Sequence, residues 1–250
     1  MIVCYARLID IEGKNKMLEN INWNEIALVL EDFIKNFVRL CKLLGAGGLV
    51  SLKVFFLTLI FSLPFGLLIA FGRMSEKKWI NGPVRLFILI MRGTPLLLQL
   101  IFVYFTPSYL PEPIRINLDR FTAAIIAFSF NYSAYFAEIY RGGIESISQG
   151  QYEAAAVLGF TKIQTFIRII LPQVIKRILP SISNEVITLV KDTALVMSLG
   201  ISELYRAARN EAARVFSTSP IFIAGLFYLL MNYVVTKVFD KIEKKLSYYR

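Results

Sequence analysis

Long apolar runs separated by short polar stretches are the main pattern in this chain. A run of roughly 20 apolar residues is long enough to cross the hydrocarbon core of a bilayer as a helix. Five such runs occur, at about residues 49–71, 83–105, 121–140, 180–199 and 220–238. The pattern therefore predicts an all-α, polytopic membrane protein with five transmembrane helices.

Two of the predicted spans carry residues that are unusual in a bilayer. The sequence Arg92-Gly93-Thr94-Pro95 interrupts the second span, and its glycine and proline predict a break in the helix. The fourth span is polar, because it contains Asn184, Glu185, Lys191 and Asp192. Charged groups within a bilayer are costly, so we expect them to face a cavity or one another.

The chain before the first run is more mixed. Between residues 17 and 47, charged residues alternate with an apolar set at helical spacing, namely Ile26, Leu30, Phe33, Phe37, Leu40 and Leu44. This spacing predicts an amphipathic helix lying in the membrane interface, and a helix packed on another subunit fits the pattern equally. Gly45, Gly47 and Gly48 are expected to break the chain before the first span.

These boundaries give the predicted domain organisation. Residues 1–48 form an N-terminal extension with the interfacial helix, residues 49–240 the transmembrane domain, and residues 241–250 a tail. The first residues mix charges without the apolar core of a cleavable signal peptide. Met17 is an alternative start of translation.

Composition and charge agree with a membrane protein. Of 250 residues, 56% are hydrophobic and 18% are charged, against about 25% charged in a typical soluble domain. The formal net charge of +10 would suit a nucleic-acid binder, but basic residues gather in the loops at 73–81 and 141–180 and in the tail. Because basic loops tend to stay in the cytoplasm, we expect the N-terminus outside and the C-terminus inside. Topology then accounts for the charge without a nucleic acid.

Several chemistries are excluded by what the sequence lacks. There is no histidine, and Cys4 and Cys41 have no metal-ligand spacing, so we expect no metal site. The Walker A pattern that binds ATP phosphates and the nucleophile elbow of hydrolases are both missing. We therefore expect a chain that is not an enzyme and binds no cofactor itself.

The polar stretch after the third span contains the most specific motif. It reads Glu153-Ala154-Ala155, three residues, Gly159, nine residues, and then Ile169-Ile170-Leu171-Pro172. This stretch resembles the EAA loop of ABC-type import permeases, E-A-A-x₃-G-x₉-I-x-L-P, and every fixed position is filled.

The resemblance implies a role for the whole chain. It points to the transmembrane domain of a type I ABC importer in a bacterial inner or plasma membrane. The implied partners are a separate ATPase, which would bind ATP and Mg, and an extracytoplasmic binding protein. The residues implied to couple to the ATPase are Glu153, Ala154, Ala155, Gly159, Ile169, Leu171 and Pro172. Because five spans are too few to enclose a pathway, we also expect a second copy or a homologous permease, as a homodimer or a heterodimer.

The coupling loop, residues 150–172, also has a mechanical interpretation. An alanine-rich helix at residues 151–158 would let another surface approach closely, and Gly159 permits a turn with positive φ. Thr161 is placed to cap a second short helix, which Pro172 would end or kink. The alternative is a loop helix that packs only on its own bundle.

Further stretches are similar to the polar-amino-acid branch of these permeases. They are Arg92–Leu96, Ala134–Ile144, Gly150–Ala155 and Lys191–Leu195. The resemblance covers about residues 45–245 and implies a polar amino acid as the substrate. It leaves open whether that amino acid is basic, acidic, an amide or sulfur-containing.

Candidate substrate contacts come from polar residues within the spans. Arg92 should lie near the bilayer midplane, where a guanidinium can bind an α-carboxylate in bidentate fashion. Asp192, Glu138 and the amide of Asn131 are candidates for the α-ammonium or a polar side chain. Thr94 and Thr193 complete the set, although a threonine in a span often bonds its own helix.

Two alternatives stay open at this point. In the first, Arg92 pairs with Glu138, and Lys191 and Asp192 pair elsewhere, so that these charges only hold helices together. In the second, the chain is an ion-coupled carrier or channel that works without an ATPase. The lack of an inverted repeat argues against a carrier.

Overall fold

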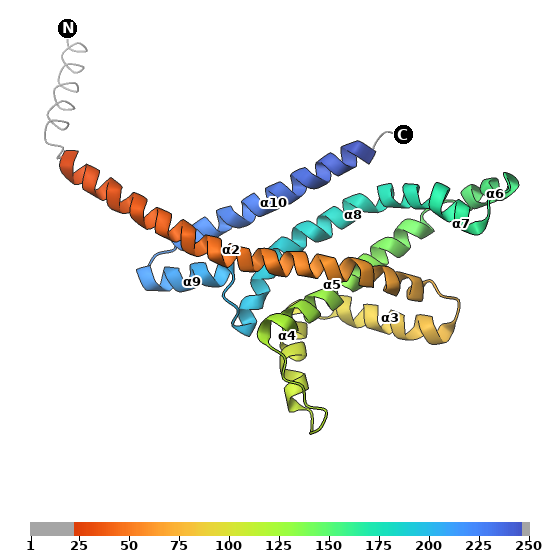
Figure 1. Cartoon of the computed structure of the whole chain (residues 1–250), viewed down its shortest axis with the longest axis horizontal. Helices are drawn as coiled ribbons and strands as arrows, with labels where there is room; N and C mark the ends of the chain where they lie inside the picture. The colour runs from red at the N-terminus through yellow and green to blue at the C-terminus, as the bar shows by residue number, and fades with distance from the viewer. Residues whose placement is uncertain (1–22, 247–250) are drawn as a thin grey trace, which may run out of the picture. The chain divides into compact units, whose positions relative to one another are not determined.

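The computed structural model describes residues 23–246, and all the regular elements in that range are helices. The expected all-α fold is therefore confirmed for this part of the chain. Two compact units are separated at Leu43/Leu44, and the second, Leu44–Arg250, contains all the predicted spans. The helices carry the labels of Figure 1.

The first described helix, α2, runs from Trp23 to Arg73 without interruption. The expected break at Gly45, Gly47 and Gly48 is therefore wrong. A Cβ atom on Gly47 would lie 3.0 Å from backbone atoms of Glu203 and Leu204, so this glycine allows two backbones to approach closely. Residues 17–22 of the predicted interfacial helix and the alternative start at Met17 lie outside the described residues, and the interfacial position stays a prediction.

The remaining helices follow the predicted order. The second span is broken into α3 and α4, as expected, and the fourth runs as one helix past Pro180 before a 3-10 turn. The long helices are α3 (Lys78–Gly93), α4 (Leu96–Phe105), α5 (Arg120–Glu145), α8 (Leu171–Asp192), α9 (Leu204–Val215) and α10 (Ser219–Leu246). The short elements are η1 (Thr106–Tyr109), α6 (Gln149–Val157), α7 (Lys162–Thr165), the π-helical turn η2 (Phe166–Ile170) and the 3-10 helix η3 (Thr193–Leu199).

Length and composition identify only some of these helices as membrane spans. Among the described residues, the segment Ile34–Arg73 of α2 and the helix α10 are long and apolar enough to cross a bilayer. The bent pair of α3 with α4 and η1 is a third candidate if it counts as one span. The helices α5 and α8 are more polar, so the count of five spans stays a prediction.

The helix α5 lies at the centre of the second unit. It packs against α3, α4 and α8, and its buried aromatic residues Phe128, Tyr132 and Phe136 form much of the core. It also lies close to α2, because a Cβ atom on Gly66 of α2 would lie 3.0 Å from Cβ of Phe136. A helix enclosed by its neighbours does not need the apolar surface that lipid requires, which explains why α5 is more polar than α2.

The polar helix α9 is anchored by a buried carboxylate. Glu203 is fully buried and accepts bonds of 2.6 Å from the backbone N–H groups of Tyr205 and Arg206, which caps the helix. The hydroxyls of Ser51 on α2 and Tyr228 on α10 also donate to it. In Figure 1, η3 and α9 follow one end of α8, whereas α6 and α7 lie at the other.

Candidate functional site

The break between α3 and α4 creates the first part of the candidate site. The helix α3 ends at Gly93, Thr94 and Pro95 are extended, and α4 with η1 is bent by 111° from α3. Because Pro95 has no N–H, the carbonyl oxygen of Met91 loses the donor that a continuous helix would give it.

Two buried amide side chains replace the lost helix bonds. Nε2 of Gln99 donates to the carbonyl oxygens of Met91 and Thr94, at 2.9 and 3.2 Å. Nδ2 of Asn131 donates to the same Met91 oxygen and to Oε1 of Gln99, both at 3.0 Å. Sequence reasoning missed Gln99. Its signal was a single amide in the otherwise apolar run that follows Pro95.

Arg92 lies at the end of α3, where two residues of α5 hold its guanidinium. The guanidinium carbon is 5.3 Å from the centre of the Tyr135 ring, a distance typical of a cation–π contact. Nη1 of Arg92 lies 3.8 Å from Oε2 of Glu138, and 44% of the arginine side chain is exposed. Arg92 is therefore oriented on one side and open on the other.

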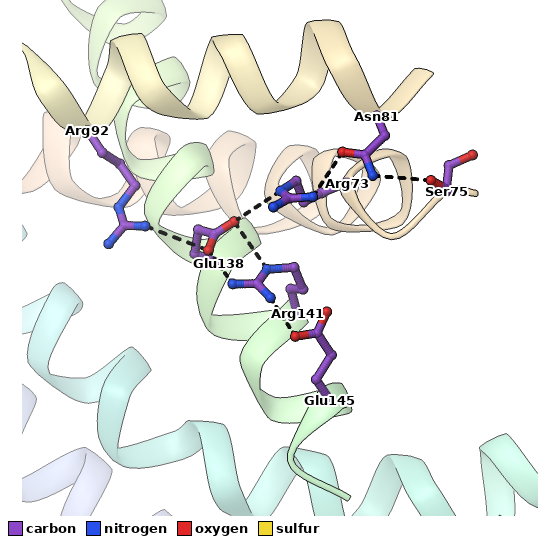
Figure 2. Close-up of polar contacts among 7 residues, drawn as sticks. All are labelled: Arg73, Ser75, Asn81, Arg92, Glu138, Arg141 and Glu145. Carbon is purple, nitrogen blue, oxygen red and sulfur yellow. Dashed lines mark hydrogen bonds and ion pairs between the residues drawn. The ribbon is translucent and has the colours of Figure 1, made fainter. Parts of the chain in front are cut away.

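Glu138 is the hub of a cluster of charged side chains. Arg141 binds its carboxylate with two bonds, of 3.3 and 2.7 Å, and Nε of Arg73 lies 3.8 Å from Oε1. Figure 2 shows the guanidinium groups of Arg73, Arg92 and Arg141 directed at this one carboxylate, with Glu145 on the far side of Arg141. Three arginines against two glutamates leave an excess of positive charge, which favours an anion.

Asp192 is held by a residue one helical turn from Tyr135. The hydroxyl of Tyr132 donates a bond of 2.7 Å to Oδ2 of Asp192 at the end of α8. The rings of Tyr132 and Tyr135 are 6.4 Å apart. Neighbouring side chains of α5 thus contact a cation from α3 and an anion from α8.

The other predicted contacts make bonds to the backbone. The hydroxyl of Thr94 donates to the carbonyl oxygen of Ile90 at 2.9 Å, and that of Thr193 to Val190 at 2.7 Å. Arg92 and Glu138 are therefore brought together, Asp192 reaches the same region through Tyr132, and Thr94, Asn131 and Thr193 support the local backbone.

The coupling loop forms the helix–glycine–helix structure that its sequence predicts. The helix α6 ends at Val157, and Gly159 has a φ of +77°. Thr161 then caps α7 by accepting the N–H of Gln164 at 3.3 Å, while Oε1 of Gln164 accepts the N–H of Thr161 at 2.9 Å. These reciprocal bonds make a capping box.

Pro172 lies in the first turn of α8 and does not end the helix. The π-helical turn η2 precedes it, in which the N–H of Leu171 bonds to the carbonyl oxygen of Phe166. The helical turns α7, η2 and α8 follow one another without an intervening loop. The coupling loop is thereby attached directly to α8.

An apolar surface is exposed on this loop. Val157 and Ile163 are 88% and 72% exposed, and Leu158 and Ile167 are exposed beside them in sequence. Ala155 and Ile170 are buried, which fixes the orientation of both short helices. Exposed apolar side chains gathered on a short loop are typical of a protein-binding surface.

Comparison with known proteins identifies the family. The profile described as the inner membrane component of binding-protein-dependent transport systems matches residues 62–248, most of the chain. The chain belongs to this family. It is therefore a transport permease, and the family expected from the EAA loop is confirmed.

Relatives within the family agree with the amino-acid branch. The octopine transport system permease of Rhizobium radiobacter is 37% identical over 74% of this chain and 79% of its own length. The arginine transport system permease of Bacillus subtilis is 35% identical over 80% of this chain and 91% of its own. A crystal structure of an amino acid ABC transporter with histidines matches with a TM-score of 0.76 and 34% identity, over 84% of this chain and 97% of the other.

Membership in this permease family decides between the two functional classes left open by the sequence. Permeases of this family belong to ABC importers, so the main interpretation is supported over an ion-coupled carrier or channel without an ATPase.

Proposed function

We propose that this chain is the membrane-spanning permease subunit of an ABC importer for a polar amino acid, working by alternating access. The octopine and arginine permeases among its relatives support this substrate class. The observation that carries the proposal is a pair of opposite charges held by two tyrosines of α5. The guanidinium of Arg92 lies over the ring of Tyr135, and the carboxylate of Asp192 accepts a bond from the hydroxyl of Tyr132. An amino acid is a zwitterion, and each of its charged groups finds a counterpart there.

The geometry supports a different role for each charged residue. Arg92 has an open side, so its guanidinium is suited to the α-carboxylate. Asp192 uses Oδ2 for Tyr132, which leaves Oδ1 for the α-ammonium. Glu138 already meets three arginines, so its proposed role is to hold Arg92 in place.

Thr94, Asn131 and Thr193 complete the proposed site as residues that shape it. Asn131 and Gln99 hold the carbonyl group of Met91, next to Arg92, at the helix break. Thr94 and Thr193 each donate their hydroxyl within their own segment, and Oγ1 of Thr94 also accepts a bond of 2.8 Å from Nε2 of Gln99.

The coupling loop and the family support a proposal for the partners. The exposed apolar residues Val157, Leu158, Ile163 and Ile167 are proposed to dock on an ATPase that binds ATP and Mg. The coupling loop and α9 lie at opposite ends of α8 (Figure 1), which suits a cytoplasmic loop and an outward-facing α9 that meets a binding protein. A second permease would close the passage.

Uptake by the complete complex tests the proposal. The chain would be reconstituted in proteoliposomes with its ATPase and binding protein, and accumulation of radiolabelled amino acids would be measured with and without ATP. We expect ATP-dependent accumulation of a polar amino acid. Accumulation without ATP, or of no amino acid in the panel, would contradict the function.

A variant pair tests the role of Arg92 in the same assay. Arg92→Ala should raise the KM for the amino acid at least tenfold, because it removes the proposed carboxylate ligand. Arg85→Ala is the matched control, since Arg85 is an exposed arginine on the same helix. Equal KM values for both variants would remove Arg92 from the site.

A further inference from the structure

One face of α8 carries an unbroken row of exposed polar side chains. The α8 polar stripe consists of Arg177, Ser181, Asn184, Thr188 and Lys191, and all five are exposed. Their spacing alternates between four and three residues, the repeat that keeps side chains on one side of an α-helix. At about 100° and 1.5 Å per residue, the stripe occupies a sector of roughly 80° and a length of about 21 Å.

The packing of α8 fixes which way this stripe faces. The residues Val174, Ile178, Val186 and Leu189 on other faces of the helix are buried. They pack into the cores formed with α5. The stripe therefore cannot turn inward without exposing these apolar side chains, which would be unfavourable in water.

A stripe of this composition does not suit contact with lipid. The helix α10, a candidate membrane span, differs from α8, because its large exposed side chains are apolar and include Phe222, Leu226, Leu229 and Leu230. Charged side chains such as Lys191 are costly against hydrocarbon, and in membrane proteins they face an interior or a water-filled cavity. The exposed stripe of α8 therefore requires a polar environment, whereas the exposed side chains of α10 suit an apolar one.

Both ends of the stripe meet groups already described. At one end, Arg177 and Ser181 line a cavity of about 520 Å³ together with Glu138, the hub of the arginine cluster. At the other end, Lys191 precedes Asp192, which is bonded to Tyr132. The stripe therefore runs from the region of the proposed ammonium ligand to the region beneath the arginine cluster.

We propose that the α8 polar stripe is one wall of the water-filled passage through which the substrate moves, with the second permease closing the opposite side. Hydroxyl and amide groups occupy its middle and a cation stands at each end, which suits a small polar solute that carries a carboxylate. The substrate class rests on the proposed function, whereas the wetness of the stripe does not.

Cysteine labelling in the assembled complex tests this directly. Ser181→Cys and Thr188→Cys would be made singly in a background in which Cys4 and Cys41 are replaced by serine. Leu229→Cys on α10 is the matched control, because Leu229 is 65% exposed and apolar. The complexes in proteoliposomes would be treated with a membrane-impermeant, charged thiol reagent. Since the thiolate reacts and forms only in a polar environment, we expect labelling at Ser181→Cys and Thr188→Cys at least ~tenfold faster than at Leu229→Cys.

The nucleotide state provides a second measurement. In an alternating-access passage, trapping the ATPase with ATP and vanadate should change the labelling rates of Ser181→Cys and Thr188→Cys, and leave that of Leu229→Cys unchanged. Labelling of both stripe positions as slow as the control in every state would overturn the proposal. So would rapid oxidation of Thr188→Cys to a disulfide between two permeases without labelling, because the stripe would then lie in a dry contact. Uptake measured in parallel separates a failure of the substrate assignment from a failure of the passage.

Discussion

The hydroxyl of Tyr132 donates a hydrogen bond of 2.7 Å to Oδ2 of Asp192, which is 60 residues further along the chain. Tyr132 is 2% exposed, so this bond is made in the core between α5 and α8. Asp192 is the last residue of α8, at the point where the chain continues into the 3-10 helix η3. The tyrosine therefore fixes the direction of the carboxylate at this junction.

Removing this hydroxyl should weaken substrate binding more than the rate of transport. In Tyr132→Phe, Asp192 loses a bond to a charged acceptor, typically worth about 1.5–3 kcal/mol, and its orientation with it. We expect the KM for amino-acid uptake to rise roughly tenfold, with a smaller change in maximal rate. Tyr140→Phe is the matched control on α5, because its hydroxyl makes only a 3.4 Å contact, to Leu63. Similar KM values for the two variants would separate Tyr132 from the site.

Tyr135 should support substrate binding through the contact of its ring face with Arg92, and not through its hydroxyl. The guanidinium of Arg92 lies 5.3 Å from the ring centre, and such contacts contribute about 0.5–2 kcal/mol. Tyr135→Phe keeps the ring and should retain a near-normal KM, whereas Tyr135→Leu should raise the KM several-fold. The effect on the amino acid would be compared with the effect on its carboxamide, which lacks the carboxylate. The carboxamide would be measured by its own uptake or by its competition with the amino acid. If Tyr135→Leu affects both compounds equally, Tyr135 does not act through Arg92.

Features that depend on neighbours in sequence could be predicted. Gly159 has the positive φ that its place in the motif suggests, and Thr161 caps the next helix. The break at Pro95 also follows from local composition. Each of these outcomes depends on turn chemistry, capping or missing N–H groups within a few residues.

Features that depend on distant neighbours could not be predicted. Gly47 looked like a helix breaker, because its partner Glu203 follows more than 150 residues later. The bonds that the amide nitrogen of Asn131 makes to Met91 and Gln99 across helices could not be read from the sequence either. A polar residue in a predicted span has several possible partners, and only the packing of the helices selects one.

The left-handed backbone at Gly159 should make this position sensitive to any side chain. Its φ is +77°, and a Cβ atom in that region costs roughly 1–2 kcal/mol. Gly159→Ala should lower the amount of substrate transported per ATP hydrolysed, because the angle between α6 and α7 changes where the ATPase is proposed to dock. Gly150→Ala is the control in the same loop, since its Cβ atom would meet nothing within 4 Å. Unchanged coupling in Gly159→Ala would argue against a rigid coupling loop.

Gly143 sets how closely α5 and α8 approach below the charged cluster. A Cβ atom there would lie 2.1 Å from Cγ2 of Ile178 and 3.2 Å from Cγ1 of Val174, so the helices must move apart or Ile178 must shift. Overpacking of this kind typically costs about 1–3 kcal/mol, and we expect Gly143→Ala to lower the melting temperature of the purified complex. Gly142→Ala should not, because its Cβ atom would meet nothing within 4 Å. In an Ile178→Ala background, which removes the clashing Cγ2 atom, Gly143→Ala should lower the melting temperature less than it does in the wild-type protein. Strictly additive effects of the two substitutions would show that the two side chains do not compete for the same space.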